Sequence, residues 1–76
     1  MSRIEKFKME REGLVKPGDE VRISEHKSGL YAYIIEPAVA MSGCYEFRDR
    51  ILSRTGRVVE VETLASGWMV HAEFEN

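Results

Sequence analysis

Residues 57–74 read Arg-Val-Val-Glu-Val-Glu-Thr-Leu-Ala-Ser-Gly-Trp-Met-Val-His-Ala-Glu-Phe. They contain two runs in which every second residue is apolar or small and its neighbours are mostly polar, as in strands with one buried face. The residues predicted to face inward are Val59, Val61, Thr63, Trp68, Val70, Ala72 and Phe74. Between the runs, Ala65 and Ser66 are small, and Gly67 can take the positive φ that closes a turn. We therefore predict a β-hairpin.

The outward face of this hairpin is acidic. Residues 58–76 contain no lysine or arginine, and their acidic residues are Glu60, Glu62, Glu73 and Glu75. This spacing is typical of a solvated strand face. The alternative is a docking surface for a basic partner.

Length and composition limit what the chain can be. With 76 residues it has room for one hydrophobic core, so we predict a single domain over residues 1–76. Its 11 Lys and Arg against 13 Asp and Glu give a formal net charge of −2, which argues against strong non-specific nucleic-acid binding. Cys44 is the only cysteine, which excludes an intrachain disulfide. Because the chain shows neither a secretory signal nor a membrane-spanning run, we expect a cytoplasmic location.

Residues 2–12 fit two alternatives. An N-cap serine with Glu5 three residues later, and Ile4 three residues before Phe7, suit a short helix, which we favour. Phe7 and Met9 alternating with charged residues suit an edge strand instead. As an edge strand, this segment would also offer a surface for a homodimer.

The middle of the chain predicts two more strands. Lys16-Pro17-Gly18-Asp19 is a turn signal, since proline presets φ at one corner and glycine accepts a positive φ at the next. Alternating apolar residues predict a strand over residues 20–24. Aromatic and β-branched residues predict another over residues 31–36, ended by Pro37, with the apolar wall of a loop as the alternative.

Residues 38–55 have the weakest pattern. Ser42 suits the N-cap of a short helix in which Cys44, Phe47 and Ile51 share one face, with Gly56 at its end. A long structured loop is the alternative.

Three segments resemble the small SH3-like β-barrels, and most closely the KOW-type modules. They are Pro17-Gly18-Asp19-Glu20-Val21-Arg22-Ile23, Gly56-Arg57-Val58-Val59-Glu60-Val61 and Trp68-Met69-Val70-His71-Ala72-Glu73-Phe74. They are similar to the family's Gly-Asp entering a first strand, its Gly-x-Val-x-x-Val segment and its strand ending in an aromatic residue. The resemblance implies an all-β fold with minor α content: a small SH3-like barrel of four to five strands with an inserted loop or short helix between Ser24 and Gly56. It carries over no functional residues, because the family's association with RNA would require a more basic surface.

The only local concentration of basic residues lies in residues 48–57. The candidate contact residues for a nucleic acid or a protein partner are Arg48, Arg50, Arg54, Arg57, Tyr31 and Tyr33. Exposed, coplanar arginines and tyrosines would suit single-stranded nucleic acid, whereas dispersed or buried ones favour a protein adaptor. We expect a non-enzymatic binding or adaptor module with a protein partner. Weak binding of RNA or another single-stranded nucleic acid through residues 48–57 is the alternative.

Catalytic and metal-binding patterns are weak. Cys44 with His26 or His71 is the only nucleophile and base pairing available, and no third group in the sequence orients it. One cysteine and two distant histidines lack the spacing of metal ligands, and the glycines are isolated at turns. We therefore predict no enzyme activity and no metal, cofactor or membrane site. Cys44 is expected to be a small buried side chain.

Overall fold

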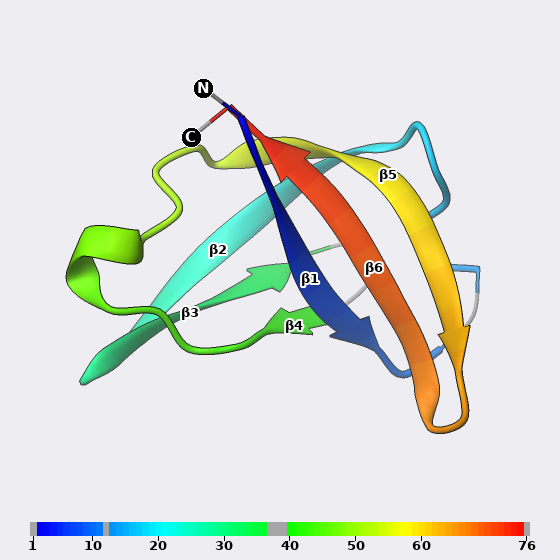
Figure 1. Ribbon diagram of the computed structural model, residues 1–76, viewed down its shortest axis with the longest axis horizontal. Coiled ribbons are helices and arrows are strands. Elements are labelled where there is room, and N and C mark those ends of the chain that lie inside the picture. Colours follow the sequence, from blue (N-terminus) through cyan, green and yellow to red (C-terminus); the bar gives the residue numbers. More distant parts are fainter. Residues whose placement is uncertain (1, 12, 37–39, 76) are drawn as a thin grey trace.

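The computed structural model describes residues 2–11, 13–36 and 40–75 as six antiparallel strands in a closed barrel (Figure 1). The strands are β1 Arg3–Met9, β2 Glu20–Ser28, β3 Leu30–Ile35, β4 Ala40–Ser42, β5 Thr55–Leu64 and β6 Gly67–Phe74. Around the barrel they follow the order β1-β4-β3-β2-β5-β6. The predicted all-β barrel is confirmed. The predicted count of four to five strands is wrong, because segments assigned to a helix or an irregular loop form β1 and β4.

The predicted hairpin is present as β5 and β6. Its turn is Ala65 and Ser66, because Leu64 pairs with Gly67 across it. Within the hairpin the register shifts: Val58 pairs with Ala72, but Glu60 already pairs with His71. Val59 is thus the extra residue of a β-bulge, and a bulge changes which residues of the strand face inward.

This bulge corrects the predicted inward set at one position. Val58 is buried at 1% exposure, whereas Val59 points outward at 41%. Beyond the bulge Val61 is partly buried and pairs with the fully buried Val70, whereas Thr63, also predicted to face inward, is exposed. Trp68, predicted to face inward, is partly buried and packs against the core next to the hairpin turn.

The N-terminal segment is a strand, so the favoured helix is wrong. β1 pairs with β6 over seven residue pairs, from Arg3–Phe74 to Met9–Trp68. Phe7 and Met9 are fully buried, whereas Ile4, expected to share a helix face with Phe7, is 57% exposed. This segment adopts the strand alternative because β1 lies between β4 and β6, where its absence would leave the barrel open. Residue 12, at the end of the predicted segment, lies outside the described residues.

Both strands predicted in the middle of the chain are present, and the first is longer than expected. β2 continues to Ser28, four residues past the predicted end. Gly29, at a φ of 82°, then turns the chain directly into β3. β3 ends at Ile35, and Pro37, the expected stop signal, lies outside the described residues.

Of the two alternatives for the segment after Ser42, the helix is wrong and the structured loop is right: residues 43–54 form a loop between β4 and β5. Ser42 ends β4, and its Oγ accepts a hydrogen bond from the backbone N–H of Tyr33. One 3₁₀ turn at Phe47–Asp49 follows, and the described residues contain no α-helix. Cys44 is exposed rather than buried. No helix in the described part of the chain has the length and apolar character needed to span a membrane.

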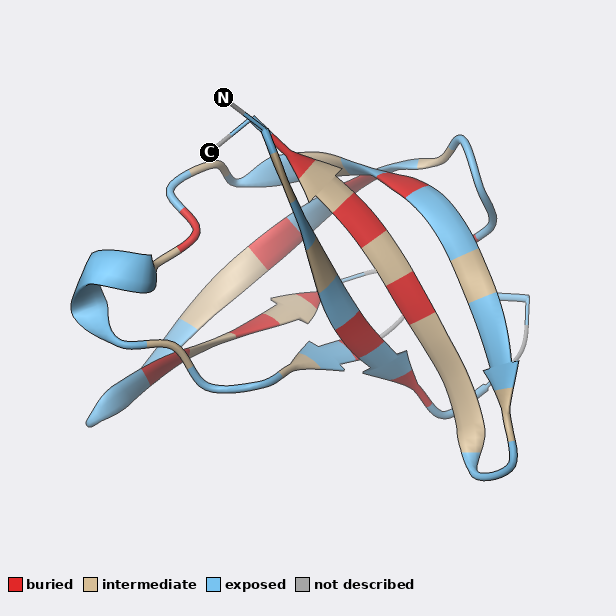
Figure 2. Cartoon of the chain, viewed as in Figure 1, coloured by how far each residue is buried: buried red, intermediate tan, exposed pale blue. Residues whose placement is uncertain are grey.

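The core fills the barrel interior, and buried positions alternate with less buried ones along β6 (Figure 2). Its buried side chains are Phe7, Met9, Val15, Val21, Ile23, Tyr31, Tyr33, Ile35, Ala40, Ile51, Val58, Val70, Ala72 and Phe74. β5 packs closely over this core at Gly56. A Cβ atom there would lie 2.5 Å from two ring carbons of Phe74 and 2.7 Å from the carbonyl oxygen of Glu73. Glycine is therefore required for this approach.

Candidate functional site

The β4–β5 loop, residues 43–54, covers one end of the barrel (Figure 1). Two backbone hydrogen bonds of 2.7 and 2.9 Å join Tyr45 to Tyr31 of β3. Further along, the side chain of Ile51 is fully buried in the core. The loop is thus held at two points, and the turn Phe47–Asp49 between them projects outward.

Tyr33 fixes the second of these points. Its hydroxyl donates to Glu25 Oε2 at 2.8 Å and accepts the backbone N–H of Ile51 at 3.0 Å. Burial raises the pKa of Tyr33, and the hydrogen bond to Glu25 raises it further. A buried loop amide is thereby satisfied by a side chain of the barrel.

A second polar cluster holds the loop from the β1 side. Tyr45 donates its hydroxyl to Glu5 Oε1 at 2.7 Å, and Arg3 Nε pairs with Glu5 Oε2 at 2.7 Å. Arg3 also donates through Nη1 to the carbonyl oxygen of Arg50 at 3.0 Å. Burial is the main cause that raises the pKa of Tyr45, followed by the hydrogen bond to Glu5. Side chains from the barrel wall therefore support both halves of the loop.

The outer side of the loop carries two large apolar groups at the surface. Phe47 is 69% exposed and Leu52 is 56% exposed. Together with Arg3, Arg48 and Arg50 they line an open pocket of about 390 Å³. We call these five residues the Phe47 surface.

The guanidinium of Arg50 is the centre of the Phe47 surface. Its Cζ lies 4.9 Å from the ring centroid of Phe47 and 5.2 Å from that of Tyr31. Such cation–π contacts hold the arginine and the ring in one arrangement. The result is an apolar surface with cationic side chains around it.

Three of the predicted arginines lie in the β4–β5 loop, and each lies within 4.0 Å of a carboxylate. Arg50 Nε and Arg54 Nη2 lie 4.0 and 3.6 Å from the carboxylate of Glu25. Arg48 lies 3.5 Å from Glu46, and both side chains are mostly exposed. Pairs of this kind on the surface contribute little to stability, so Arg48 remains free to engage a partner.

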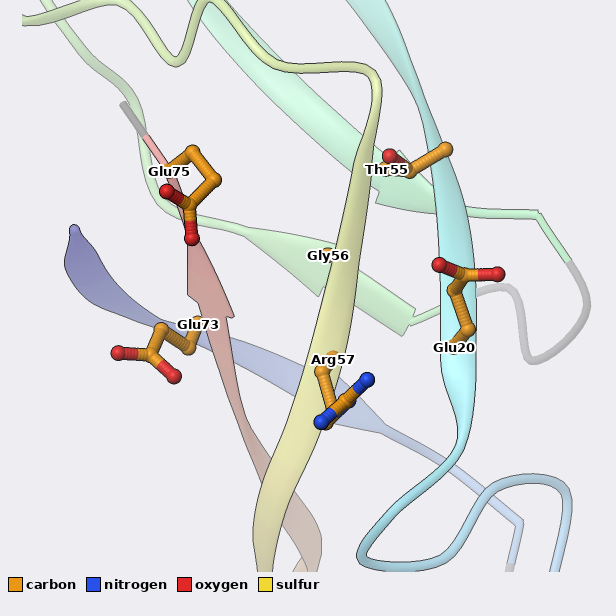
Figure 3. A pocket seen from close by; sticks show the side chains of 6 residues that line it. All are labelled: Glu20, Thr55, Gly56, Arg57, Glu73 and Glu75. Carbon is orange, nitrogen blue, oxygen red and sulfur yellow. The ribbon is translucent and has the colours of Figure 1, made fainter.

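The fourth predicted arginine lies apart from the others. Arg57 belongs to β5, and its neighbours in the sheet are Glu20 on β2 and Glu73 on β6 (Figure 3). Together with Thr55, Gly56 and Glu75 these residues line a second open pocket of about 250 Å³. The predicted group of four arginines is therefore divided between two sites, and the second site is predominantly acidic.

The two predicted tyrosines are core residues. Tyr33 is fully buried and Tyr31 is 8% exposed, so neither presents a ring face for stacking with a base. The exposed aromatic residue of the site is Phe47, which the sequence had suggested for the inner face of a helix. Arg3 and Leu52 were also missed, and no local signal links Arg3 to residues more than 40 positions away.

The residues considered for chemistry are dispersed. His26 contacts Ser24 Oγ at 3.1 Å, and His71 contacts Glu62 Oε1 at 3.3 Å. Cys44 stands exposed at the start of the β4–β5 loop. Within the described residues, no group of three or more His, Cys, Asp or Glu side chains is placed to hold a metal ion.

Comparison with known proteins identifies no relative: no protein-family model, no curated protein and no solved structure matches the chain.

Proposed function

We propose that this chain is a non-enzymatic, cytoplasmic protein-binding module of the SH3-like class, and that it contacts its partner through the Phe47 surface. The observation that carries the proposal is the exposure of Phe47 and Leu52 on a loop that is held at both ends. Large apolar side chains at a rigid surface are typical of interaction sites, because little conformational entropy is lost when they bind.

The charges around Phe47 and Leu52 define the partner. The Phe47 surface contains three arginines. Two of the carboxylates paired with them, Glu5 and Glu25, are only 20% and 18% exposed, whereas Glu46, which pairs with Arg48, is 64% exposed. A partner segment that carries an apolar residue next to carboxylates would complement this surface. The KOW-like character suggested by the sequence is part of this proposal as a fold assignment only.

Single-stranded nucleic acid is the second candidate partner. The exposed ring of Phe47, stacked on Arg50, supports it, since bases bind such aromatic and guanidinium groups. Three features favour a protein instead. The tyrosines are buried, Arg50 and Arg54 share Glu25, and Arg57 lies among carboxylates in another pocket.

Affinity capture from a cell lysate, with and without nuclease, tests the proposal on the double variant Phe47→Ser, Leu52→Ser. The control is Ile4→Ser, Met41→Ser, which removes similarly exposed apolar residues, 57% and 54% exposed, from strands β1 and β4. We expect the wild type and the control to capture the same protein after nuclease treatment, and the Phe47 double variant to lose it.

Two results would count against a protein partner at this surface. Capture that survives the Phe47 and Leu52 changes would show that the contact lies elsewhere. Capture that disappears on nuclease treatment, together with direct binding of single-stranded RNA whose affinity falls steeply with salt, would favour the nucleic-acid alternative.

A further inference from the structure

Half of β5 has a backbone neighbour on one side only. β6 pairs with β5 as far as the hairpin turn, but β2 pairs only with residues 55–57. Gly18 and Asp19 then bond to the backbone of Val58. Past Val58, the described residues supply no further backbone hydrogen bond on that side. Within the described part of the chain, residues 59–64 therefore form an open strand edge, and a row of unpaired backbone groups is a template for another strand.

The two faces next to this edge differ in chemistry. On the outer face Glu60 and Glu62 are both exposed. On the inner face Val61 and Trp68 are only partly buried, and Thr63 is exposed. A strand added here would place alternate side chains next to the two glutamates and the intervening ones over Val61 and Trp68.

The glutamates also determine which strand is accepted. If a second copy of the chain continued the sheet through the same edge, Glu60 and Glu62 of the two copies would lie opposite or diagonal to one another. Like charges at such positions destabilise a strand pair. The pair therefore acts against self-association and favours an added strand of opposite charge.

We propose that residues 59–64 of β5 bind an extended segment of a partner protein as an added strand, with lysine or arginine at alternate positions and apolar residues between them. This binding mode obtains affinity from backbone hydrogen bonds and specificity from alternate side chains. The site lies outside the Phe47 surface and shares none of its residues. It also gives a role to the acidic face of the hairpin and to the partial exposure of Trp68.

The test uses the full chain and an eight-residue peptide that alternates lysine with valine, with both ends blocked. Matched peptides replace every lysine with glutamate, or every second valine with proline, which cannot extend a ladder. We expect the lysine peptide to shift the backbone amide signals of residues 59–64, slow their hydrogen exchange and move the emission of Trp68, the only tryptophan, to shorter wavelength. The other two peptides should bind at least about tenfold more weakly.

Charge reversal at the edge supplies the decisive variant. The double variant Glu60→Lys, Glu62→Lys should bind the lysine peptide at least about tenfold more weakly than the wild type does, and it should bind the glutamate peptide more tightly. The control Glu36→Lys, Glu75→Lys makes the same change in net charge at exposed residues outside the strands and should bind like the wild type.

Three results would overturn the proposal. The first is no change at residues 59–64 with the lysine peptide. The second is equal binding of the proline peptide, which would mean charge attraction without strand pairing. The third is protection of these amides that increases with the concentration of the protein alone, which would identify a second copy as the occupant.

Discussion

Replacing Tyr33 with phenylalanine removes one hydroxyl group that holds the β4–β5 loop onto the barrel. The ring and its packing against Tyr45, at a centroid distance of 5.7 Å, stay in place. Two hydrogen bonds are lost, one to Glu25 and one from the backbone N–H of Ile51. Because the amide of Ile51 is buried, no water replaces its partner in the folded state.

The cost follows from these two bonds. A buried donor left without an acceptor costs about 1–3 kcal/mol. The bond to Glu25 adds about 1 kcal/mol, since the carboxylate keeps Arg50 and Arg54 as partners. We expect Tyr33→Phe to lower the free energy of unfolding by about 2–4 kcal/mol. A domain of 76 residues has roughly 4–11 kcal/mol in total.

Urea denaturation followed by circular dichroism measures this loss, and the control is Tyr45→Phe. The hydroxyl of Tyr45 donates to Glu5, which keeps Arg3 as a partner, so its removal should cost about 1 kcal/mol. A Tyr33→Phe variant within about 0.5 kcal/mol of the wild type, or one more stable than Tyr45→Phe, would refute the reasoning.

Three further predictions concern stability. Gly56→Ala should lower the free energy of unfolding, measured by heat or urea, by at least about 1–3 kcal/mol, because the new methyl group would overlap the ring of Phe74. The control Gly43→Ala, whose methyl group would have nothing within 4 Å, should not lower it. Val58→Ala should cost about 2 kcal/mol and Val59→Ala less than about 0.5 kcal/mol, and the reverse order would contradict the bulge. The raised pKa of Tyr45 means that the folded state holds this proton more tightly than the unfolded state. This stabilisation is complete below pH 10, the ordinary pKa, and is lost as the pH rises further. The free energy of unfolding should therefore fall between pH 9 and pH 11, and it should fall less in Tyr45→Phe than in the wild type.

The hairpin could be predicted because its signals are local. Alternation along both runs and a small-residue turn depend only on neighbouring residues. The bulge at Val59 could not be predicted in this way. It arises where β5 pairs with β6 while its first residues also pair with β2. The N-terminal segment carried both a helical and a strand pattern. Pairing with β6, whose partner residues lie 59 to 71 positions away in sequence, decided between them.

The candidate site was predictable only in part. The arginines were visible as a cluster in the sequence. The sequence could not show that β5 begins between Arg54 and Arg57, which places Arg57 in the barrel wall and Arg54 in the loop. Nor could it show which of two apolar loop residues turns inward. Ile51 enters the core and Phe47 faces solvent because the hydroxyl of Tyr33, on a distant strand, fixes the loop at Ile51.

Amide hydrogen exchange at Ile51 tests most directly whether the β4–β5 loop is held rigidly enough to present a binding surface. If the hydroxyl of Tyr33 binds this amide as the structure shows, its protection should match that of Val70 in the barrel wall and fall at least about tenfold in Tyr33→Phe. Exchange in the wild type as fast as that of the exposed loop residue Cys44 would contradict a fixed loop, and with it the proposed binding surface.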